Sequence, residues 1–381
     1  MKKKILFITY NLKLGGTSST LYDLVQLIDK DKYDVTIFTI HDGGDWEPRF
    51  REHGVPVINA YTNMQGGKGL WKKVQNHIML MRIKYIRKHM GKGFIECCVG
   101  EKFDLVVLHH SYEPYELAPF LSGAATIRYI HGDVKNNPRY RWVLDQSAEH
   151  FSKFDRIICV SKVAKQSFVE AYGCADKTLV CYNPINSDEI NQKSEQSVDL
   201  HCGVPYICVV GRLAPEKGVE RLVRIHGKLI QDGVQHKLLI VGEGPERSNI
   251  ERAVKETGTQ DSVILVGYQD NPYPYIRNSY FTVCPSYSEG LHMASMESLC
   301  LGVPVVSAVE PVQELFGDEF CGIIAENDDA SLEAGIRKML TDADFYQQAK
   351  RGAQKRSSAF RAEVMIKQVE QIYDAVMEGK K

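Results

Sequence analysis

The sequence lacks the cysteine spacing of a metal or redox site. Its ten cysteines include one neighbouring pair, Cys97 and Cys98, and no Cys-x-x-Cys, which argues against a zinc site or a disulfide framework. Others, such as Cys159 and Cys208, stand inside apolar runs, where cysteine behaves as a small buried hydrophobic residue. A reducing compartment is therefore expected.

Long apolar runs are also missing. No stretch approaches the roughly 18 apolar residues that span a bilayer. The apolar run that ends at residue 10 follows three lysines as in a signal peptide, but it is short and soon meets Asn11 and a glycine pair, so residues 4–10 indicate a first strand. We expect a cytoplasmic protein.

The chain has no excess of charge of one sign. Lys and Arg number 47 and Asp and Glu 48, a formal net charge of -1, which argues against a dedicated nucleic-acid binder. With 381 residues, of which 44% are hydrophobic, the chain is too long for one compact core. Two domains are therefore expected.

Short apolar runs alternate with longer helical patterns along the chain. Strands are expected at 4–10, 34–40, 104–109, 125–130, 155–160, 206–210, 237–241, 262–266, 280–284 and 304–308. Helices are expected at 17–30, 70–90, 137–153, 162–172, 219–230, 246–256, 291–301, 331–340 and 360–377. The alternation predicts an α/β fold with parallel strands, and the continuous apolar strands indicate sheets covered on both faces.

One polar segment interrupts the alternation. Residues 186–203 lack apolar periodicity, which predicts a linker between domains at 1–185 and 204–359. The amphipathic helix at about 360–381 is expected to pack back on the first domain. Two doubly wound, Rossmann-like domains would bring the carboxyl ends of their strands to one central crevice, where ligands bind.

Two cations follow the predicted strand 206–210. Gly211 turns the chain, Arg212 and Lys217 follow, and a helix begins after Gly218. Helix-start amides and two cations suit a diphosphate, although the spacing differs from the Walker pattern. Taken alone, a phosphate site and two surface cations on a loop are equally good interpretations.

Two carboxylates follow the predicted strand 280–284. In a helix, the eight steps from Glu289 to Glu297 span about 12 Å, which is too far for a glycosidase pair but suits the hydroxyls of an elongated ligand. Gly290 permits close backbone approach. The alternative, solvated helix charges, is weak for Glu297 because its neighbours are apolar.

These residues belong to a set of motifs that resembles the family 4 retaining glycosyltransferases of the GT-B fold, over nearly the whole chain. The set consists of Gly15-Gly16, Val160-Ser161, Gly211-Arg212-Leu213, Lys217-Gly218, Gly242-Glu243-Gly244-Pro245, Val266-Gly267-Tyr268, Glu289 to Glu297, and Leu301-Gly302-Val303-Pro304-Val305-Val306. The resemblance implies transfer, with anomeric retention, of a hexose or N-acetylhexosamine from a nucleotide-diphosphate sugar. A UDP-sugar donor, a saccharide or lipid-linked acceptor, and a role in bacterial surface polysaccharide such as capsule are family-level expectations.

The resemblance also implies a role for each matching residue. Arg212 and Lys217 would bind the diphosphate and stabilise the leaving nucleotide, while Glu297 would hold the ribose and Glu289 the sugar. The other implied donor contacts are Gly16, Gly242, Tyr268, Gly290, Leu291, His292 and Met293. His292 departs from the usual family pattern, and it either tunes sugar choice or is an idle substitution.

His131 ends the predicted strand 125–130. A lone histidine is more often structural than catalytic, but this one stands at a strand end, where the crevice is expected. The family usually has a histidine here, so we expect His131 to be catalytic. His109 and His110 follow another strand and rank below it as acceptor-site candidates.

No metal or other cofactor is expected. The Asp-x-Asp spacings at Asp29 to Asp31 and Asp342 to Asp344 lie at predicted helix ends rather than after strands. Arg212 and Lys217 would supply the charge that a metal ion supplies in the other large class of glycosyltransferases.

The segment 68–92 is basic, because no acidic residue occurs between Glu52 and Glu96. Two interpretations stay open. An ordinary crossover helix with a solvated basic face is slightly favoured over peripheral contact with the cytosolic face of the inner membrane.

Two other functions share the fold. A nucleotide-sugar epimerase would lack the motif set given above. A non-catalytic GT-B partner subunit would not be expected to keep Arg212, Lys217, Glu289 and Glu297 together.

Overall fold

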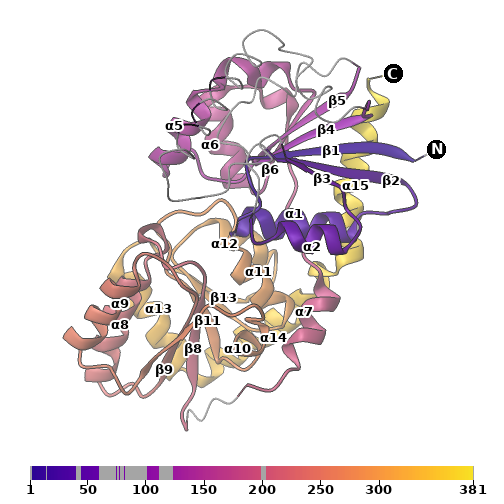
Figure 1. Ribbon diagram of the computed structural model, residues 1–381. Coiled ribbons are helices and arrows are strands. Elements are labelled where there is room, and N and C mark those ends of the chain that lie inside the picture. The colour runs from indigo at the N-terminus through magenta and orange to yellow at the C-terminus, as the bar shows by residue number, and fades with distance from the viewer. Residues whose placement is uncertain are drawn as a thin grey trace. The chain divides into compact units, whose positions relative to one another are not determined.

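The computed structural model describes residues 2–13, 15–39, 44–59, 74, 77, 81, 101–110, 123–198 and 203–380. Most of the predicted helix 70–90 and of the basic segment 68–92 lies outside these residues. The chain forms two compact units (Figure 1), Met1–Val160 with Ala164–Asn183 and Ile366–Lys381, and Ser161–Val163 with Pro184–Met365. In the described part, no helix is long and apolar enough to cross a membrane.

The first unit contains a seven-stranded parallel sheet in the order β3-β2-β1-β4-β5-β6-β7. The strands are β1 (Lys3–Thr9), β2 (Tyr33–Thr39), β3 (Val57–Asn59), β4 (Leu105–His110), β5 (Ala125–Ile130), β6 (Arg156–Cys159) and β7 (Thr178–Val180). The described helices are α1 (Gly16–Leu27), α2 (Glu47–Glu52), α5 (Pro138–Asp145) and α6 (Lys162–Tyr172), with most of α15 (Ala362–Glu378). The strand order reverses between β1 and β4.

The second unit contains a six-stranded parallel sheet in the order β10-β9-β8-β11-β12-β13. The strands are β8 (Tyr206–Val210), β9 (Lys237–Val241), β10 (Val263–Gly267), β11 (Phe281–Cys284), β12 (Val305–Ser307) and β13 (Gly322–Ile324). The helices are α7 (Ser187–Ser194), α8 (Val219–Gln231), α9 (Arg247–Glu256), α10 (Tyr273–Arg277), α11 (Met293–Cys300), α12 (Pro311–Phe316), α13 (Asp329–Thr341) and α14 (Ala343–Arg356). Here the order reverses between β8 and β11.

Both sheets are buried on two faces. Consecutive residues of β1, from Ile5 to Ile8, are all at most 1% exposed, as a strand covered on both sides requires. In the second unit, Leu222 and Ile225 of α8 pack into the core with Ile207 of β8. The predicted α/β class with two Rossmann-like parallel sheets is therefore confirmed.

The polar segment 186–203 is not wholly a linker, because it contains α7. The side chain of Asn186 caps this helix by accepting a hydrogen bond from the Glu189 N–H, and Ile190 is buried. The chain already belongs to the second unit from Pro184 onward. The helix has too few apolar residues to produce a periodic pattern, since caps and polar contacts hold it.

The predicted helix 137–153 is divided. It consists of α5 and a 3-10 helix, Ala148–Lys153, with Gln146 and Ser147 between them. Three strands were missed, namely β3, β7 and β13, which have three residues each. Runs of that length are too short for a strand pattern.

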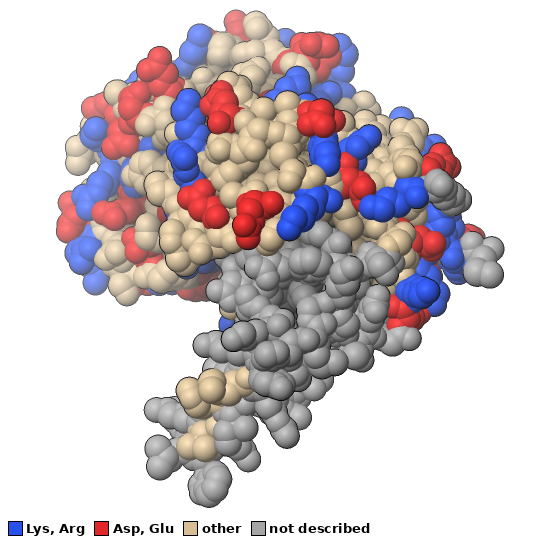
Figure 2. All heavy atoms as spheres, turned by 90° about the horizontal axis from the view of Figure 1, so that it is seen from above, with Lys and Arg blue, Asp and Glu red and all other residues tan. Residues whose placement is uncertain are grey.

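Charges of both signs are distributed over the surface. On the face shown in Figure 2, Lys and Arg side chains are interspersed with Asp and Glu, in keeping with the net charge of -1. Where the structure describes this face, therefore, no broad region of one sign is visible.

Helix α15 is anchored to the first unit by buried and half-buried polar contacts. Its Asp374 accepts hydrogen bonds from Lys3 Nζ at 2.9 Å and from the Tyr33 hydroxyl at 2.8 Å. The hydroxyls of Tyr373 and Tyr129 lie 3.0 Å apart, and both residues are buried. These contacts join the end of the chain to β1, β2 and β5.

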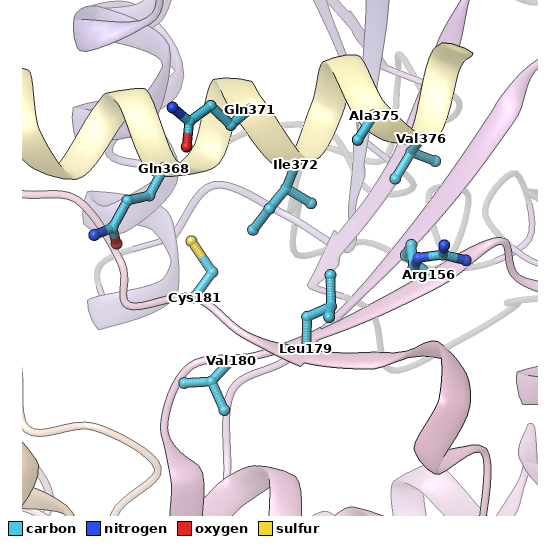
Figure 3. A pocket seen from close by; sticks show the side chains of 9 residues that line it. All are labelled: Arg156, Leu179, Val180, Cys181, Gln368, Gln371, Ile372, Ala375 and Val376. Carbon is cyan, nitrogen blue, oxygen red and sulfur yellow. The ribbon is translucent and has the colours of Figure 1, made fainter. Parts of the chain in front are cut away.

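The same helix covers the edge strand β7. Between them lies a cavity of about 360 Å³, which Figure 3 shows with Ile372 directed from the helix toward Leu179 and Arg156 at one end. An uncovered edge strand would offer unpaired backbone groups to another chain. Helix α15 therefore protects this edge of the sheet.

Candidate functional site

The residues predicted to bind a donor follow strands that end at one edge of the second sheet. Arg212 and Lys217 follow β8, Gly242 follows β9, Tyr268 follows β10, and the segment 285–293 follows β11. The strand order reverses between β8 and β11, and parallel α/β sheets bind ligands at such a switch point.

Glycines allow the loops at this edge to touch. Gly218 has a φ of 62°, and a Cβ there would overlap the carbonyl oxygen of Pro285. A Cβ on Gly242 would overlap the carbonyl oxygen of Gly211. Any side chain at Gly218 would therefore force the loops after β8 and β11 apart.

Lys217 and Glu289 meet where these two loops touch. Lys217 Nζ donates to Glu289 Oε1 at 2.6 Å, and the Ser286 hydroxyl donates to the same oxygen at 2.7 Å. The Glu289 side chain is 11% exposed and the Lys217 side chain 27%. The pair is thus fixed in position and remains reachable from solvent.

Both members of this pair are charged. Burial by itself lowers the pKa of Lys217, but the attraction of Glu289 outweighs it and raises that pKa. Burial likewise works to raise the pKa of Glu289, but Lys217 and then His292 outweigh it, so the pKa of Glu289 is lowered. At neutral pH the site therefore presents an ammonium and a carboxylate in contact.

His292 lies at the N-terminus of α11 as its cap. Its Nδ1 accepts from the Ser295 N–H at 3.2 Å, and the Ser295 hydroxyl lies 2.7 Å from the same nitrogen. Burial lowers the pKa of His292 to about 4. The imidazole is therefore neutral at physiological pH.

Arg221 was not predicted from the sequence to belong to the site. It is 5% exposed, and its Nε and Nη2 donate to the carbonyl oxygens of Pro285 at 2.7 Å and Ser286 at 3.0 Å. Its guanidinium also lies 4.2 Å from the ring centre of Tyr287. Arg221 thereby fastens the loop that carries Glu289, and the available signal was a cation among the apolar residues of α8.

Arg212 and Glu297 do not join the Lys217–Glu289 contact. The Arg212 side chain is 62% exposed and forms a 2.6 Å ion pair with Glu216. Glu297 belongs to α11, and its carboxylate has no hydrogen-bond or ion-pair partner in the described part of the chain. Burial raises the pKa of Glu297 to about 7.

The remaining predicted donor contacts follow β10 and β11. Leu291 is buried, Gly290 precedes it, and Met293 begins α11. Tyr268 is 47% exposed, and its hydroxyl donates to Asp270 at 3.0 Å.

One group of side chains has the composition of a metal site. Ligand atoms of Cys284, Glu289 and His292 lie within 4.8 Å of one another. Burial raises the pKa of Cys284 to about 12, so the thiol is protonated, and the Lys217 ammonium already holds Glu289. A divalent cation would meet that ammonium, and the donor set does not favour a resident metal.

The first unit carries the two remaining predicted site residues. Gly16 begins α1, and a Cβ on it would meet no atom of the described residues within 4 Å, so their packing does not require a glycine there. His131 follows β5, and its Nε2 donates to the His109 carbonyl at 2.8 Å. Burial, and then His110, lowers the pKa of His131 to about 3, so its ring is neutral and Nδ1 is an acceptor.

His109 and His110 lie beside His131 at the end of β4. His109 is 1% exposed, its ring centre is 4.5 Å from that of His131, and neither of its ring nitrogens has a hydrogen-bond partner in the described structure. Burial lowers the pKa of His110 to about 4. The three imidazoles form a neutral cluster at this edge of the first sheet.

Two family models match the chain. The model for glycosyl transferases group 1 matches residues 191–356, and the model for glycosyltransferase family 4 matches residues 14–189.

Curated relatives match part of the chain. An N-acetylgalactosamine-N,N'-diacetylbacillosaminyl-diphospho-undecaprenol 4-alpha-N-acetylgalactosaminyltransferase from Campylobacter jejuni is 31% identical over 55% of this chain and 57% of its own length. The capsular polysaccharide biosynthesis glycosyltransferase CapM from Staphylococcus aureus is 21% identical over 58% of this chain and 60% of its own. The chain thus aligns with less than two thirds of the length of these relatives.

Solved structures match over nearly the whole chain. The structure of HepE from Anabaena in complex with UDP and glucose has a TM-score of 0.77 at 17% identity, and covers 98% of this chain and 100% of that one. At this identity the similarity concerns the fold.

The role of Arg221 can be tested by substitution. Arg221→Met would remove the donor of the Pro285 carbonyl oxygen and leave the Ser286 carbonyl oxygen with a 3.4 Å contact from Asn327 Nδ2, and we expect it to lower the free energy of unfolding by about 2–4 kcal/mol. Arg224→Met is the matched control, because Arg224 lies on the same helix but is exposed and bonded to Glu220 and Glu256. We expect it to cost less than about 1 kcal/mol in urea denaturation at pH 7. Equal losses in the two variants would contradict the anchoring role.

Proposed function

The chain belongs to the group 1, family 4 glycosyltransferases, and we propose that it moves a hexose or N-acetylhexosamine from a UDP-sugar to a saccharide or lipid-linked saccharide, with anomeric retention. The observation that carries this proposal is the Lys217–Glu289 contact at the switch point between β8 and β11. A cation and a carboxylate at this position suit a ligand in which phosphate adjoins a polyol.

The cations would bind the donor diphosphate. Lys217 is held close to the strand ends, whereas Arg212 is exposed and, among the described residues, is paired with Glu216 alone, a surface contact that a phosphate can replace. Together they would neutralise the charge that develops on the leaving nucleotide, so the reaction would need no metal ion.

Glu297 would bind the ribose of the nucleotide. Its carboxylate has no partner in the described chain, and it lies on α11, the helix that follows the Glu289 loop. Two adjacent ribose hydroxyls could donate to its two oxygens.

The transfer would proceed on one face of the sugar. The bond between the anomeric carbon and the phosphate oxygen breaks, the acceptor oxygen bonds to the same face, and the acceptor proton passes to the departing phosphate.

Glu289 is held by Lys217 and Ser286, so it serves as a hydrogen-bond acceptor rather than a nucleophile. In the first unit, the neutral His131 would accept a hydrogen bond through Nδ1. Positioning and electrostatics would thus supply the catalysis.

Relatives support the substrate classes. HepE was solved with UDP and glucose, the Campylobacter enzyme is named for a diphospho-undecaprenol acceptor, and CapM is named for capsular polysaccharide biosynthesis. We propose the same classes for this chain, acting at the cytosolic face of the inner membrane.

A small surface in the first unit suits contact with an anionic membrane. Trp142 of α5 is 65% exposed. Arg139 and Arg141 flank it on the outer side of the helix, both exposed and without an ion-pair partner in the part of the chain that the structure describes. We propose that this surface, together with the basic segment 68–92, attaches the enzyme to anionic lipid.

The proposed activity can be tested by substituting Lys217. The purified protein is expected to release UDP from a UDP-sugar, with water or a saccharide as acceptor. Lys217→Ala should lower kcat by about 100-fold, because the leaving nucleotide loses its cation. Lys228→Ala, an exposed lysine of α8, is the control. A Lys217→Ala variant with the wild-type rate would refute the site, and interconversion of UDP-sugars without UDP release would indicate an epimerase.

The proposed role of Glu297 predicts that the affinity for UDP-glucose depends on pH. Because the raised pKa of Glu297 is about 7, its carboxylate is mostly protonated at pH 6 and mostly ionised at pH 8. The ionised form accepts ribose hydroxyls, so the Kd for UDP-glucose should fall by about tenfold from pH 6 to pH 8. Glu297→Gln should bind weakly at both pH values in calorimetry, and Glu256→Ala should behave like the wild type. A pH-independent wild type would contradict the assignment.

Membrane contact can be tested by cosedimentation with phosphatidylglycerol vesicles at low and high salt. Replacing Arg139 and Arg141 by Gln should weaken binding by about 30-fold, at about 1 kcal/mol per cation. The control replaces Arg252 and Lys255, exposed cations of α9 in the second unit. Absence of wild-type binding at low salt would refute membrane contact, and unchanged binding of the α5 variant would refute the part given to α5.

A further inference from the structure

The ring of His292 is held in one tautomer. A peptide N–H can only donate, so the Ser295 N–H makes Nδ1 an acceptor and places the ring proton on Nε2. The Ser295 hydroxyl reinforces the contact at 2.7 Å. A ring flip would turn a C–H toward the Ser295 N–H, so the orientation is fixed as well.

The ring also stays neutral. Burial lowers the pKa of His292 to about 4, since the opposing effect of Glu289 is smaller and Lys217 lowers it further. At physiological pH, His292 is therefore a single uncharged N–H donor.

This donor is unused. His292 is 7% exposed, yet its Nε2–H has no partner in the described part of the chain. The hydroxyl of Ser288, on the loop that carries Glu289, is a buried polar atom without a partner in the described part of the chain. Buried polar groups are normally hydrogen-bonded, so the Ser288 hydroxyl and the unused donor of the largely buried His292 together point to a ligand at this loop.

The chemistry beside the ring indicates which part of the ligand this is. A ring nitrogen of His292 lies within 4.8 Å of a Glu289 oxygen, and Glu289 contacts Lys217. On the function proposed above, the ligand group here would adjoin a phosphate, and it would meet a carboxylate acceptor and a neutral donor. A sugar can pair with both the acceptor and the donor, because one hydroxyl can donate to Glu289 while a neighbouring one accepts from Nε2–H.

We propose that His292 is a specificity-determining residue, which donates Nε2–H to one hydroxyl of the sugar carried by the nucleotide. This rests on the function proposed above. Donor sugars would be distinguished by whether the sugar carbon that faces Nε2–H carries a hydroxyl, and by the direction in which that hydroxyl points from the ring. Such discrimination arises because a mismatched sugar leaves a buried donor unpaired.

Two substitutions separate the hydrogen bond to sugar from the helix cap. His292→Asn keeps an acceptor at the cap, since asparagine is a favoured cap residue, but it has no donor at the reach of Nε2. His292→Gln keeps an N–H at about that reach. The Kd for UDP, UDP-glucose, UDP-galactose and UDP-N-acetylglucosamine would be measured calorimetrically for both variants and the wild type, with thermal unfolding as the check on folding.

The expected result is a loss of affinity for UDP-sugars without a matching loss of affinity for UDP. In His292→Asn, the Kd for UDP should stay within about twofold, while that for the preferred UDP-sugar rises by about tenfold and the differences among sugars shrink. His292→Gln should recover part of the preference. Unchanged sugar preference in His292→Asn, or an equal loss for UDP and its sugars, would overturn the role of His292 alone.

The nucleotide is tested by the wild type in the same experiment. Binding of GDP and GDP-mannose in place of UDP and its sugars would correct the nucleotide, and the variants would then be compared with GDP-sugars in the same way. No binding of any nucleotide sugar by the wild type would overturn the proposed function and this inference together.

Discussion

The contact between Lys217 and Glu289 is the constraint on which the rest of the site depends. Two charges separated by 72 positions meet because Gly218 lets one loop rest on the carbonyl of Pro285. Burying either charge alone would be costly, whereas the pair is stable because each charge offsets the desolvation of the other. The neighbouring groups are then arranged around this pair, with Ser286 on the same oxygen and Arg221 behind the loop.

Much of the fold could be predicted from the chain because parallel strands are buried on both faces. Such strands are continuous apolar runs, and Ile5 to Ile8 or Ile207 to Val209 could be recognised as such. Elements that are held by polar contacts or are very short were not predicted. Helix α7 depends on its Asn186 cap, and β13 has three residues, so neither produces a pattern long enough to detect.

In the candidate site, likewise, some features could be predicted from the sequence and others could not. Strand-end positions and the family motifs indicated Lys217, Glu289 and Glu297, and Glu297 is half-buried rather than fully solvated. The contacts themselves could not be predicted, because they join loops that are distant in sequence. Arg221 is the clearest case, since a buried guanidinium on an amphipathic helix looks like an ordinary surface cation until its two carbonyl partners are seen.

The unmet polar groups around Glu289 have a consequence for the evolution of the chain. The Ser288 hydroxyl is buried without a partner, and neither the Nε2–H of His292 nor the Glu297 carboxylate has a partner in the described part of the chain. A buried group that is left unpaired lowers the stability of the empty protein. Replacing Ser288 with an apolar residue of similar size is therefore a route to a more robust fold, whereas His292 also caps α11 and would be retained. The Ser288 hydroxyl represents a trade of stability for activity, and variants selected for heat resistance alone are expected to lose it before His292.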